Sequence, residues 1–273
     1  MLSEALTYIF AKSQNKFKSL GYLREAIAIE ARHKRCHSAW SEHLKQSQQR
    51  ITEAVEKTEG RNRIVLLGAG AGHDIPLDYL LSEFEEIHLV DVIFLKSIRE
   101  KAKQSPAIKL IESDVTGIIN PLFEDKNRIN VTDLNLCPPD ELLIGADLVV
   151  SCNLLSQLPI NIKNRLVALG ENEDSKELGG FCRSIINSHL KWLESCDASI
   201  LLISDFERHL VPQDGAKGKI VKSNALFGIS FLMPDHLWVW DIAPRPEIDR
   251  MFSLKHLVGS IYLQEKEAFK FKS

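Results

Sequence analysis

The sequence has few cysteines, little net charge and no long hydrophobic run. Its five cysteines are an odd number, stand far apart and include no C-x-x-C pair, so neither a disulfide framework nor a cysteine-based zinc site is expected. This cysteine usage suits a reducing compartment such as the cytoplasm. The longest apolar stretch, residues 225–233, is far shorter than the ~20 residues of a membrane-spanning helix. We therefore expect a cytoplasmic protein without a membrane segment.

Positive and negative charges nearly balance in this chain. Its 273 residues include 34 Lys and Arg against 37 Asp and Glu, a formal net charge of −3. Without an overall basic field, nucleic acid is not an expected partner. Apolar residues make up 44% and charged residues 26% of the sequence, which are ordinary values for a folded protein. The length suits one large domain, or one domain with an appendage.

The first 60 residues are predicted to form a helical extension or lid. Neither proline nor glycine occurs between Leu23 and Val55, and apolar residues recur there every three or four positions. Gly21 is expected to separate two helices. A turn at residues 59–62 ends this pattern, so we divide the chain into an extension, 1–60, and a main domain, 61–273.

From residue 63 the pattern changes to short apolar runs separated by helical segments. Such runs are typical of strands buried on both faces of a parallel sheet. Strands are expected at 63–67, 87–92, 108–111, 146–152 and 198–204, and helices at 74–84, 94–104 and 178–196. Two further strands, 236–242 and 256–263, lack a comparable helix between them and predict an antiparallel pair. The predicted fold class is α/β: a doubly wound, mostly parallel sheet of about seven strands with a C-terminal antiparallel hairpin.

A glycine-rich loop follows the first expected strand. Residues 68–74 read GAGAGHD and lead into a helix, a context in which small residues let a ligand approach main-chain atoms. The free N–H groups at a helix start add a positive potential there. A dinucleotide loop of the form G-x-G-x-x-G needs glycine where this chain has His73. The loop therefore favours a nucleoside ligand other than NAD.

Polar residues follow the ends of the next strands. Asp91 ends the second strand about 20 residues after the loop, where a carboxylate can accept hydrogen bonds from both ribose hydroxyls. Asp114 ends the third strand, and Asn153 follows the fourth. Because the carboxyl ends of parallel strands share one sheet edge, we expect these side chains to surround one crevice.

The ordered motifs GAGAG, VDV, ESDV and DLVVSCNLLSQLP resemble those of the class I, Rossmann-like S-adenosylmethionine-dependent methyltransferases, over residues 40 to 265. The resemblance implies a seven-stranded fold with S-adenosylmethionine as the cofactor. It implies that the glycine loop packs on the methionine part, the acid after strand two binds ribose, the segment after strand three meets adenine, and the end of strand four surrounds the reactive centre. The matching residues are Gly68, Ala69, Gly70 and Gly72; Asp91 and Val92; Asp114 and Val115; and Asn153 and Leu154.

Two departures from the family pattern bear on function. The family usually has an acidic residue two positions before the first glycine, where this chain has Leu66; Asp74 could substitute for it, or could be only a helix cap. Many members that methylate amines or nucleobases have an aromatic residue where this chain has Ser156. The acceptor is therefore expected to be a small molecule, with a protein site as the alternative.

The leading hypothesis is a methyltransferase whose catalytic residues the sequence does not identify. One alternative is a non-catalytic module that binds S-adenosylmethionine or S-adenosylhomocysteine, motivated by Leu66 and by the lack of an identifiable base. A second alternative, an NAD-dependent oxidoreductase, is weaker because the third glycine is missing. The oligomeric state is not predicted.

Several other residues have both a functional and a structural interpretation. His33, His37 and Trp40 share one helical face; without a matching carboxylate we expect packing rather than a metal site, with His37 and Trp40 as candidate substrate contacts. Residues 205–226 are expected to be a long loop beside the crevice, in which Asp205 or His209 could be a general base. The basic stretches at 32–35 and 217–222 are interpreted as solvated faces.

Overall fold

The computed structural model describes residues 14–124, 130–213 and 218–272. Residues 1–13 of the predicted extension, and Lys217 of the second basic stretch, lie outside this part of the chain. The helices are α2 (Asn15–Ser19), α3 (Tyr22–Arg35), α4 (His37–Lys57), α5 (Leu77–Glu83), α6 (Lys96–Ala102), α7 (Ile119–Glu124), α8 (Leu158–Ala168) and α9 (Lys176–Glu194), with short 3₁₀ turns at Val131–Asp133 and Asp140–Leu142. The strands are β1 (Arg63–Leu67), β2 (Glu86–Asp91), β3 (Ile108–Glu112), β4 (Leu148–Cys152), β5 (Ser199–Pro212), β6 (Val221–Asn224), β7 (Ser230–Phe231), β8 (His236–Ala243), β9 (Phe252–Leu263) and β10 (Phe271–Lys272).

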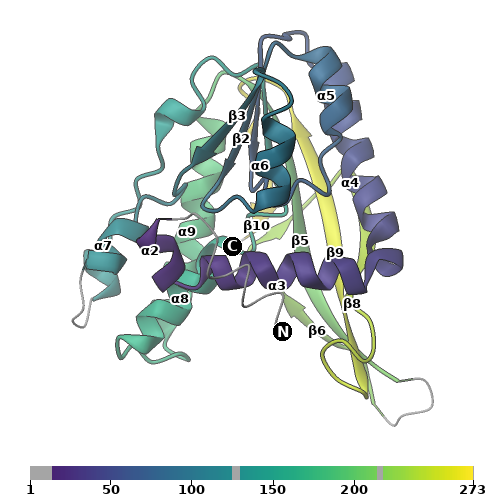
Figure 1. Cartoon of the computed structure of the whole chain (residues 1–273). Helices are drawn as coiled ribbons and strands as arrows, with labels where there is room; N and C mark the ends of the chain where they lie inside the picture. Colours follow the sequence, from purple (N-terminus) through teal and green to yellow (C-terminus); the bar gives the residue numbers. More distant parts are fainter. Residues whose placement is uncertain (1–13, 125–129, 214–217, 273) are drawn as a thin grey trace.

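The central sheet has the strand order β3-β2-β1-β4-β5-β9-β8, with β6 added beside β5 (Figure 1). Strands β1 to β5 are parallel, whereas β9 runs antiparallel to both β5 and β8. The chain moves outward in one direction from β1 to β3 and in the other from β4 to β5, so the order reverses between β1 and β4. Ligands of open α/β sheets bind at such a reversal. The architecture confirms the predicted fold class, including the C-terminal antiparallel hairpin.

Alternate residues of the central strands belong to two separate cores. In β1, Val65 and Leu67 pack with α8 and α9 on one face, whereas Ile64 and Leu66 pack with α4 and α5 on the other. All four are fully buried. Because successive strand residues point to opposite faces, a strand covered by helices on both sides needs a continuous apolar run. This is why the runs in the sequence located these strands.

The N-terminal extension differs from the prediction in one respect. Gly21 precedes α3 with φ +87°, as expected of a residue that separates two helices. A second interruption, at Cys36, divides the predicted long helix into α3 and α4. α4 packs against β8, and α3 crosses the carboxyl edge of the sheet (Figure 1). The break therefore lets one amphipathic sequence cover both a face and an edge of the sheet.

Strand β5 is much longer than predicted. The first part of the expected loop, residues 205–212, continues β5 and pairs with β9, and Val221–Asn224 returns beside it as β6. The prediction of a long loop was wrong because this half of the strand contains the polar run Glu207-Arg208-His209 and has no continuous apolar run. Helices α7 and α8 were not predicted either; each has a proline among its first three residues, Pro121 and Pro159. Among the helices in the described part of the chain, none combines the length and apolar character needed to cross a bilayer.

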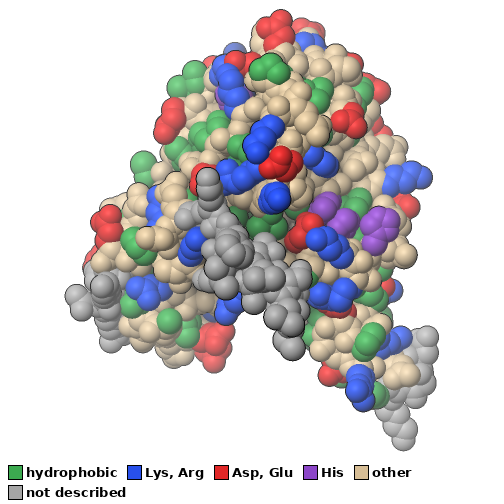
Figure 2. Space-filling model, in the orientation of Figure 1, with side chains coloured by type: hydrophobic (Ala, Val, Ile, Leu, Met, Phe, Trp, Pro, Cys, Tyr) green, Lys and Arg blue, Asp and Glu red, His purple; other side chains and the backbone are tan. Residues whose placement is uncertain are grey.

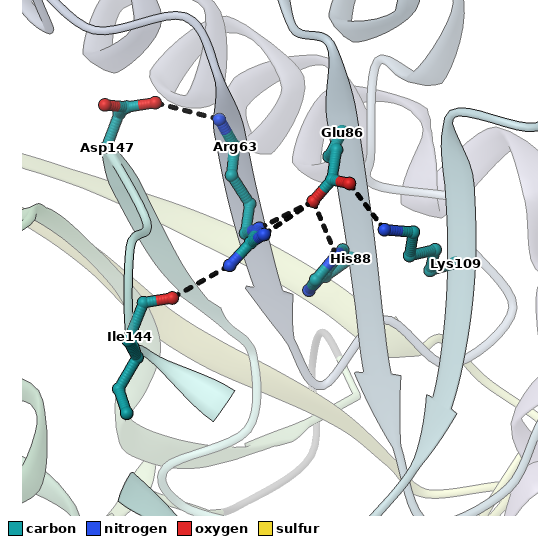
Figure 3. A network of polar contacts seen from close by, with 6 residues as sticks. All are labelled: Arg63, Glu86, His88, Lys109, Ile144 and Asp147. Carbon is teal, nitrogen blue, oxygen red and sulfur yellow. Dashed lines mark hydrogen bonds and ion pairs between the residues drawn. The ribbon is translucent and has the colours of Figure 1, made fainter. Parts of the chain in front are cut away.

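An ion-pair network joins the amino ends of β1, β2 and β3, on the edge opposite the crevice (Figure 3). Arg63 Nη2 lies 2.7 Å from Glu86 Oε2, and Lys109 Nζ lies 2.5 Å from Glu86 Oε1. The Arg63 backbone N–H also donates to Asp147 Oδ2 at 2.8 Å. Bonds from Lys109 and Arg63 lower the pKa of Glu86 to about 2. One carboxylate therefore joins three strands.

We expect Glu86→Gln to lower the free energy of unfolding at pH 7 and to have little effect near pH 2. The pKa of Glu86 lies near 2 in the native state and near 4.5 in the unfolded state, so its contribution is present above about pH 4.5 and is lost as the pH falls toward 2. Urea denaturation at pH 7 and pH 2.5 measures the difference. Glu100→Gln, which removes an exposed pair within α6, is the control. A Glu86→Gln effect of equal size at both pH values would contradict this account.

Candidate functional site

A cavity of about 510 Å³ lies at the carboxyl edge of β1 to β4. The loops that follow these strands line it together with residues of α3 and α4. α3 runs across the carboxyl edge of the sheet (Figure 1). The structure brings all the predicted cofactor-binding residues to its wall: Gly68, Ala69, Gly70, Gly72, Asp91, Val92, Asp114, Val115, Asn153 and Leu154. Their juxtaposition was predicted from strand order alone, and their role as ligand contacts stays a prediction.

The glycine loop is a tight turn that excludes side chains. Gly68, Gly70 and Gly72 all have positive φ, at +78°, +46° and +70°. A Cβ on Gly68 would lie 2.8 Å from both the Cys152 carbonyl oxygen and Leu154 Cβ. Glycine at position 68 therefore keeps the β1 loop in close contact with the end of β4, across the reversal of strand order.

Asp91 connects the glycine loop to the end of β2. Its Oδ2 accepts a hydrogen bond from Gly70 N at 2.8 Å, and its Oδ1 accepts one from Ile93 N at 3.3 Å. Burial raises the pKa of Asp91 to about 6, despite these bonds. A carboxylate held in this way retains acceptor capacity on both oxygens, and hydroxyl donors from a ligand would relieve the cost of its burial.

Asp114 serves the local turn as well as the cavity. Its Oδ1 accepts from the backbone N–H of Thr116 at 2.8 Å and from the Thr116 hydroxyl at 2.6 Å, and its Oδ2 accepts from Ile119 N at 2.8 Å. These bonds hold the turn that begins α7. Oδ2 keeps one acceptor position for a ligand.

Tyr22, at the start of α3, was missed by the sequence analysis. It lies at the cavity wall, where burial and the nearby carboxylates of Asp114 and Asp91 raise its pKa well above the usual value. Its hydroxyl therefore stays protonated and can donate a hydrogen bond. The strand motifs carry no signal for this residue; only the expected helix start at Gly21 lies close to it.

The side chains of Asp74 and Asn153 are in contact at the start of the loop that follows β4. Asn153 adopts φ +50°, and its Nδ2 donates to Asp74 Oδ2 at 2.7 Å. Cys152 Sγ donates to the same oxygen at 3.3 Å, and burial beside Asp74 raises the pKa of that thiol well above its usual value, so it remains a donor. Asn153 Oδ1 is buried and has no hydrogen-bond partner among the described residues. The loop thus offers a ligand one unused acceptor.

The structure separates the two interpretations of Asp74. Helix α5 begins at Leu77 with Pro76 as its N-cap, so the helix-cap interpretation of Asp74 is wrong. Asp74 lies instead at the cavity wall. Leu66 is fully buried in the core on the α4 and α5 side of the sheet, where a carboxylate would be surrounded by apolar side chains. Asp74, which directly follows the glycine loop, therefore brings a carboxylate to this part of the cavity wall.

Aromatic rings enclose the end of the cavity under α4. His43 stacks on Trp240 with centroids 3.9 Å apart and planes at 6°, and Trp238 Nε1 donates to His43 Nδ1 at 3.1 Å. Burial lowers the pKa of His43 to about 3, so the imidazole is neutral. Since Nδ1 accepts a bond, the hydrogen resides on Nε2, and its 3.4 Å contact with Asn153 Nδ2 is then not a hydrogen bond because both nitrogens carry hydrogen. Trp238 and Trp240 are buried, and Trp240 also lies at the cavity wall.

A bulge in β5 brings Asp205 and Arg208 to the same wall. In a regular strand, residues three apart point to opposite faces, but the register with β9 shifts at Phe206 and places both on the cavity side. The Phe206 ring occupies the space of a Cβ on Gly259, 2.3 Å from it, which shows why glycine stands there. His256 lies opposite Arg208 in this register.

Two of the other candidate residues lie away from the cavity. His209 pairs with Glu207 at 2.7 Å, and the described cavity wall does not include it. His37 is exposed and likewise outside the wall, whereas Trp40 is part of it and donates from Nε1 to the Ile242 carbonyl at 3.0 Å. Of the two predicted substrate contacts, only Trp40 is therefore in position.

The remaining histidines and basic residues of α3 form structural contacts. His33 stacks on His73 at 3.7 Å, and His73 Nε2 lies 2.7 Å from Glu30 Oε2. Figure 2 shows histidine side chains gathered beside the junction of α3 and α4, among interspersed acidic and basic side chains. Arg32 and Arg35 both pair with Glu247, and Lys34 and Arg35 are exposed, so stretch 32–35 is a solvated face that also carries ion pairs. These pairs join α3 to the segment between β8 and β9.

Comparison with solved structures finds distant likenesses to several methyltransferases. The N-methyltransferase NodS from Bradyrhizobium japonicum WM9, in complex with S-adenosyl-L-homocysteine, is 10% identical, covers 81% of this chain and 87% of its own, and has a TM-score of 0.37. A SAM-dependent methyltransferase of Leishmania major is 12% identical, with coverages of 82% and 73% and a TM-score of 0.36. The 1,6-didemethyltoxoflavin-N1-methyltransferase of Burkholderia thailandensis is 12% identical, with coverages of 87% and 89% and a TM-score of 0.30.

No family model matches the chain, and no curated protein matches it. The identities of 10–12% and TM-scores of 0.30–0.37 describe distant likenesses. The function proposed below therefore depends on this chain's own residues and their arrangement.

Proposed function

We propose that the protein is an S-adenosylmethionine-dependent methyltransferase of the class I family, acting on a small-molecule acceptor. The observation that carries this proposal is the meeting of the glycine loop, Asp91 and Asp114 in one cavity at the reversal of strand order. Carboxylates can accept hydrogen bonds from ribose hydroxyls, and the tight glycine turn lets a ligand approach the backbone beside them. Together these features suit a nucleoside that carries no phosphate. A pyrophosphate would instead require a G-x-G-x-x-G turn, and His73 occupies its last position.

Different residues of the cavity wall would bind different parts of the cofactor. Asp91, with Val92 beside it, would hold the ribose hydroxyls, and Asp114, Val115 and Tyr22 would surround the adenine. The glycine loop and Asp74 would hold the methionine part, with the carboxylate of Asp74 toward the amino group. Asn153 and Leu154 would lie beside the reacting atoms. The bound cofactor supplies a methyl group already activated on a sulfonium sulfur.

The protein's own contribution would be mainly orientation and exclusion of water. α3 and α4 cover the cavity, and Trp40 and Trp240 wall its acceptor end with ring centroids 4.9 Å apart. A covered cavity of this size favours a small acceptor over a protein site or nucleic acid. Holding acceptor and methyl group in contact is a large part of the catalysis that such a transfer needs.

We expect Asp74→Asn to weaken binding of S-adenosylhomocysteine about tenfold while leaving binding of methylthioadenosine nearly unchanged. The two ligands share the nucleoside, but only the first carries the amino acid part whose cation Asp74 would face. A charge-assisted hydrogen bond of this kind is worth about 1.5–3 kcal/mol. Calorimetric titration of both ligands gives the two ratios. Equal weakening of both ligands would show that Asp74 does not act on the amino acid part.

Thermal shift with S-adenosylhomocysteine and with NAD tests the proposed function against the oxidoreductase alternative. A ligand that binds only the native state stabilises it by RT ln(1 + [L]/Kd) and so raises the melting temperature. We expect a rise with S-adenosylhomocysteine and none with NAD; the reverse result would overturn the proposal. Binding without transfer to any of a set of small hydroxyl, amine and thiol acceptors would favour the non-catalytic module.

A further inference from the structure

A second cavity, of about 250 Å³, adjoins the main one beside β5 and β6. The side chains of Ile160 from α8 and Arg208 from β5 belong to the walls of both cavities. Lys163 and Asn164 from α8 complete the second wall together with residues 224, 225 and 227. This wall therefore contains two cations, Arg208 and Lys163, and none of the described residues that form it is acidic.

The turn that follows β6 gives the second cavity a defined wall. Asn224 Nδ2 donates to the Ile229 carbonyl at 2.8 Å. Asn224 Oδ1 accepts from Leu226 N at 2.8 Å and from Gly228 N at 2.9 Å. One side chain thus fixes the turn whose residues 225 and 227 belong to the wall, without using either of the two cations.

Arg208 keeps most of its hydrogen-bonding capacity. Its Nε lies 3.7 Å from Asp205 Oδ2, which is an ion pair too long to be a hydrogen bond. Within the described part of the chain, no acceptor is hydrogen-bonded to the Arg208 guanidinium, and 34% of the side chain is exposed. A guanidinium in this condition can donate two parallel hydrogen bonds to the oxygens of one carboxylate or phosphate group.

Lys163 brings a second cation to the same wall from a different element. Ile160, Lys163 and Asn164 are three and four positions apart and therefore share one face of α8. Lys163 Nζ donates to Glu173 Oε1 at 3.0 Å, but Glu173 is 64% exposed, so solvent screens this pair. An ammonium group has three donors, and Glu173 uses one of them. The others are available to a ligand.

This arrangement favours an anionic ligand. The acids that pair with the two cations, Asp205 and Glu173, offset part of their charge but do not belong to the wall of the second cavity. A ligand in this cavity therefore meets donors of positive charge and no carboxylate of the wall. Hydrogen bonds between charged donors and anionic oxygens are roughly twice as strong as those between neutral groups.

The strand register relates this cavity to the aromatic end of the main one. Trp240 on β8 is the partner of His256 on β9, and His256 is the partner of Arg208 on β5. Cross-strand partners lie on the same face of a sheet, and two strand spacings amount to about 10 Å. A ligand of one ring with an acidic group can therefore reach from the Trp240 side of the main cavity to Arg208.

We propose that the second cavity binds an anionic group of the methyl acceptor, a carboxylate or a phosphate, through Arg208 and Lys163. This inference rests on the proposed function, because the reacting atom of the acceptor would lie in the main cavity. Since Ile160 and Arg208 belong to both walls, one small molecule can occupy both cavities. The acceptor is then a small acid, with an apolar part beside Trp240.

Binding of three matched probes tests the anion site. Benzoate and phenylphosphonate are anions at pH 7.5, whereas benzamide has the same ring and no charge. In the protein saturated with S-adenosylhomocysteine, we expect at least one anion to bind about tenfold more tightly than benzamide, and added salt to reduce this preference. Ligand-observed NMR titration measures the three values of Kd. If neither anion binds more tightly than benzamide at millimolar concentrations, the inference is overturned, and binding of S-adenosylhomocysteine leaves the proposed function standing.

The same titrations without S-adenosylhomocysteine separate the site from the proposed function. An anion preference in a protein that binds neither S-adenosylhomocysteine nor S-adenosylmethionine would contradict the proposed function and not the anion site.

Two variants and a control locate the anion preference. Arg208→Gln should abolish it, and Lys163→Gln should reduce it a few-fold, both with unchanged affinity for S-adenosylhomocysteine. Arg208→Gln also removes the cation beside buried Asp205, whereas Lys163→Gln affects only the exposed partner Glu173 and so tests the site without that change. Arg250→Gln, at an exposed arginine outside both walls, lowers the net charge equally and should keep the full preference. A preference that survives in both cavity variants, or that Arg250→Gln reduces as much as they do, would overturn the inference.

Discussion

Replacing Asp91 with alanine should weaken binding of S-adenosylhomocysteine by about 1–3 kcal/mol, which corresponds to about 5- to 150-fold in Kd. The carboxylate joins the glycine loop, through Gly70 N, to the end of β2. Its loss would remove the proposed contacts with the ribose hydroxyls and the bond that holds the loop. Calorimetric titration of the variant measures the change. Asp78→Ala, at an exposed aspartate on α5, is the matched control and should bind as the wild type does.

The pKa of Asp91 adds a second expected result. Burial raises the pKa of Asp91 from 3.8 to about 6. A proton on Asp91 therefore stabilises the native state, and at neutral pH this proton has been lost. This contribution is fully present below about pH 3.8 and is lost as the pH rises through about 6. The difference corresponds to about 3 kcal/mol, so Asp91→Asn should stabilise the ligand-free protein at pH 7 by up to that amount and by little near pH 4.

The same titration should govern ligand binding. Ribose hydroxyls bond best to the ionised carboxylate, so the affinity of the wild type for S-adenosylhomocysteine should fall as the pH drops below about 6. In Asp91→Asn the affinity should be lower at pH 7 and nearly independent of pH over this range. A variant that is less stable than the wild type at pH 7, or that binds with wild-type affinity, would contradict this view of Asp91.

Gly68→Ala should lower the free energy of unfolding by about 2–4 kcal/mol and abolish detectable binding of S-adenosylhomocysteine. Two penalties combine: a side chain at φ +78°, and a Cβ 2.8 Å from a backbone carbonyl oxygen that cannot move aside. Relief of the overlap would separate the β1 loop from the end of β4, and the cavity floor would open.

Gly70→Ala is the matched control for this substitution. Its φ is also positive, at +46°, but a Cβ there would approach Asp91 Oδ2 only to 3.8 Å, an ordinary contact. We expect a loss of about 1–2 kcal/mol from backbone strain alone. Urea denaturation of the two variants separates strain from overlap. Equal losses at the two positions would mean that the close approach of the two loops does not hold the site together.

The sheet, and the edge of it that carries the site, could be predicted because both depend on short contiguous stretches of the sequence. Strands buried on both faces need continuous apolar runs, and the polar residue that ends each run marks the carboxyl edge. This is how Asp91, Asp114 and Asn153 were found before their contacts were known. Their meeting in one cavity then follows from parallel strand order, without knowledge of loop conformation.

The parts that were not predicted depend on contacts distant in sequence. No glycine or proline marks the break at Cys36 in the sequence. The break exists because α4 packs on β8 while α3 crosses the sheet edge. Asp205 was placed in a loop because the second half of β5 is polar on the cavity side, and only its pairing with β9 makes it a strand. Tyr22 reaches the site from a different part of the chain, so no local pattern could reveal it.

The most direct test of the account is a calorimetric titration of the wild-type protein with S-adenosylhomocysteine at pH 7.5. The arrangement of the glycine loop, Asp91 and Asp114 predicts saturable binding at one site per chain, lost in Gly68→Ala and weakened in Asp91→Ala. Absence of binding at millimolar concentrations of both S-adenosylhomocysteine and S-adenosylmethionine would contradict it.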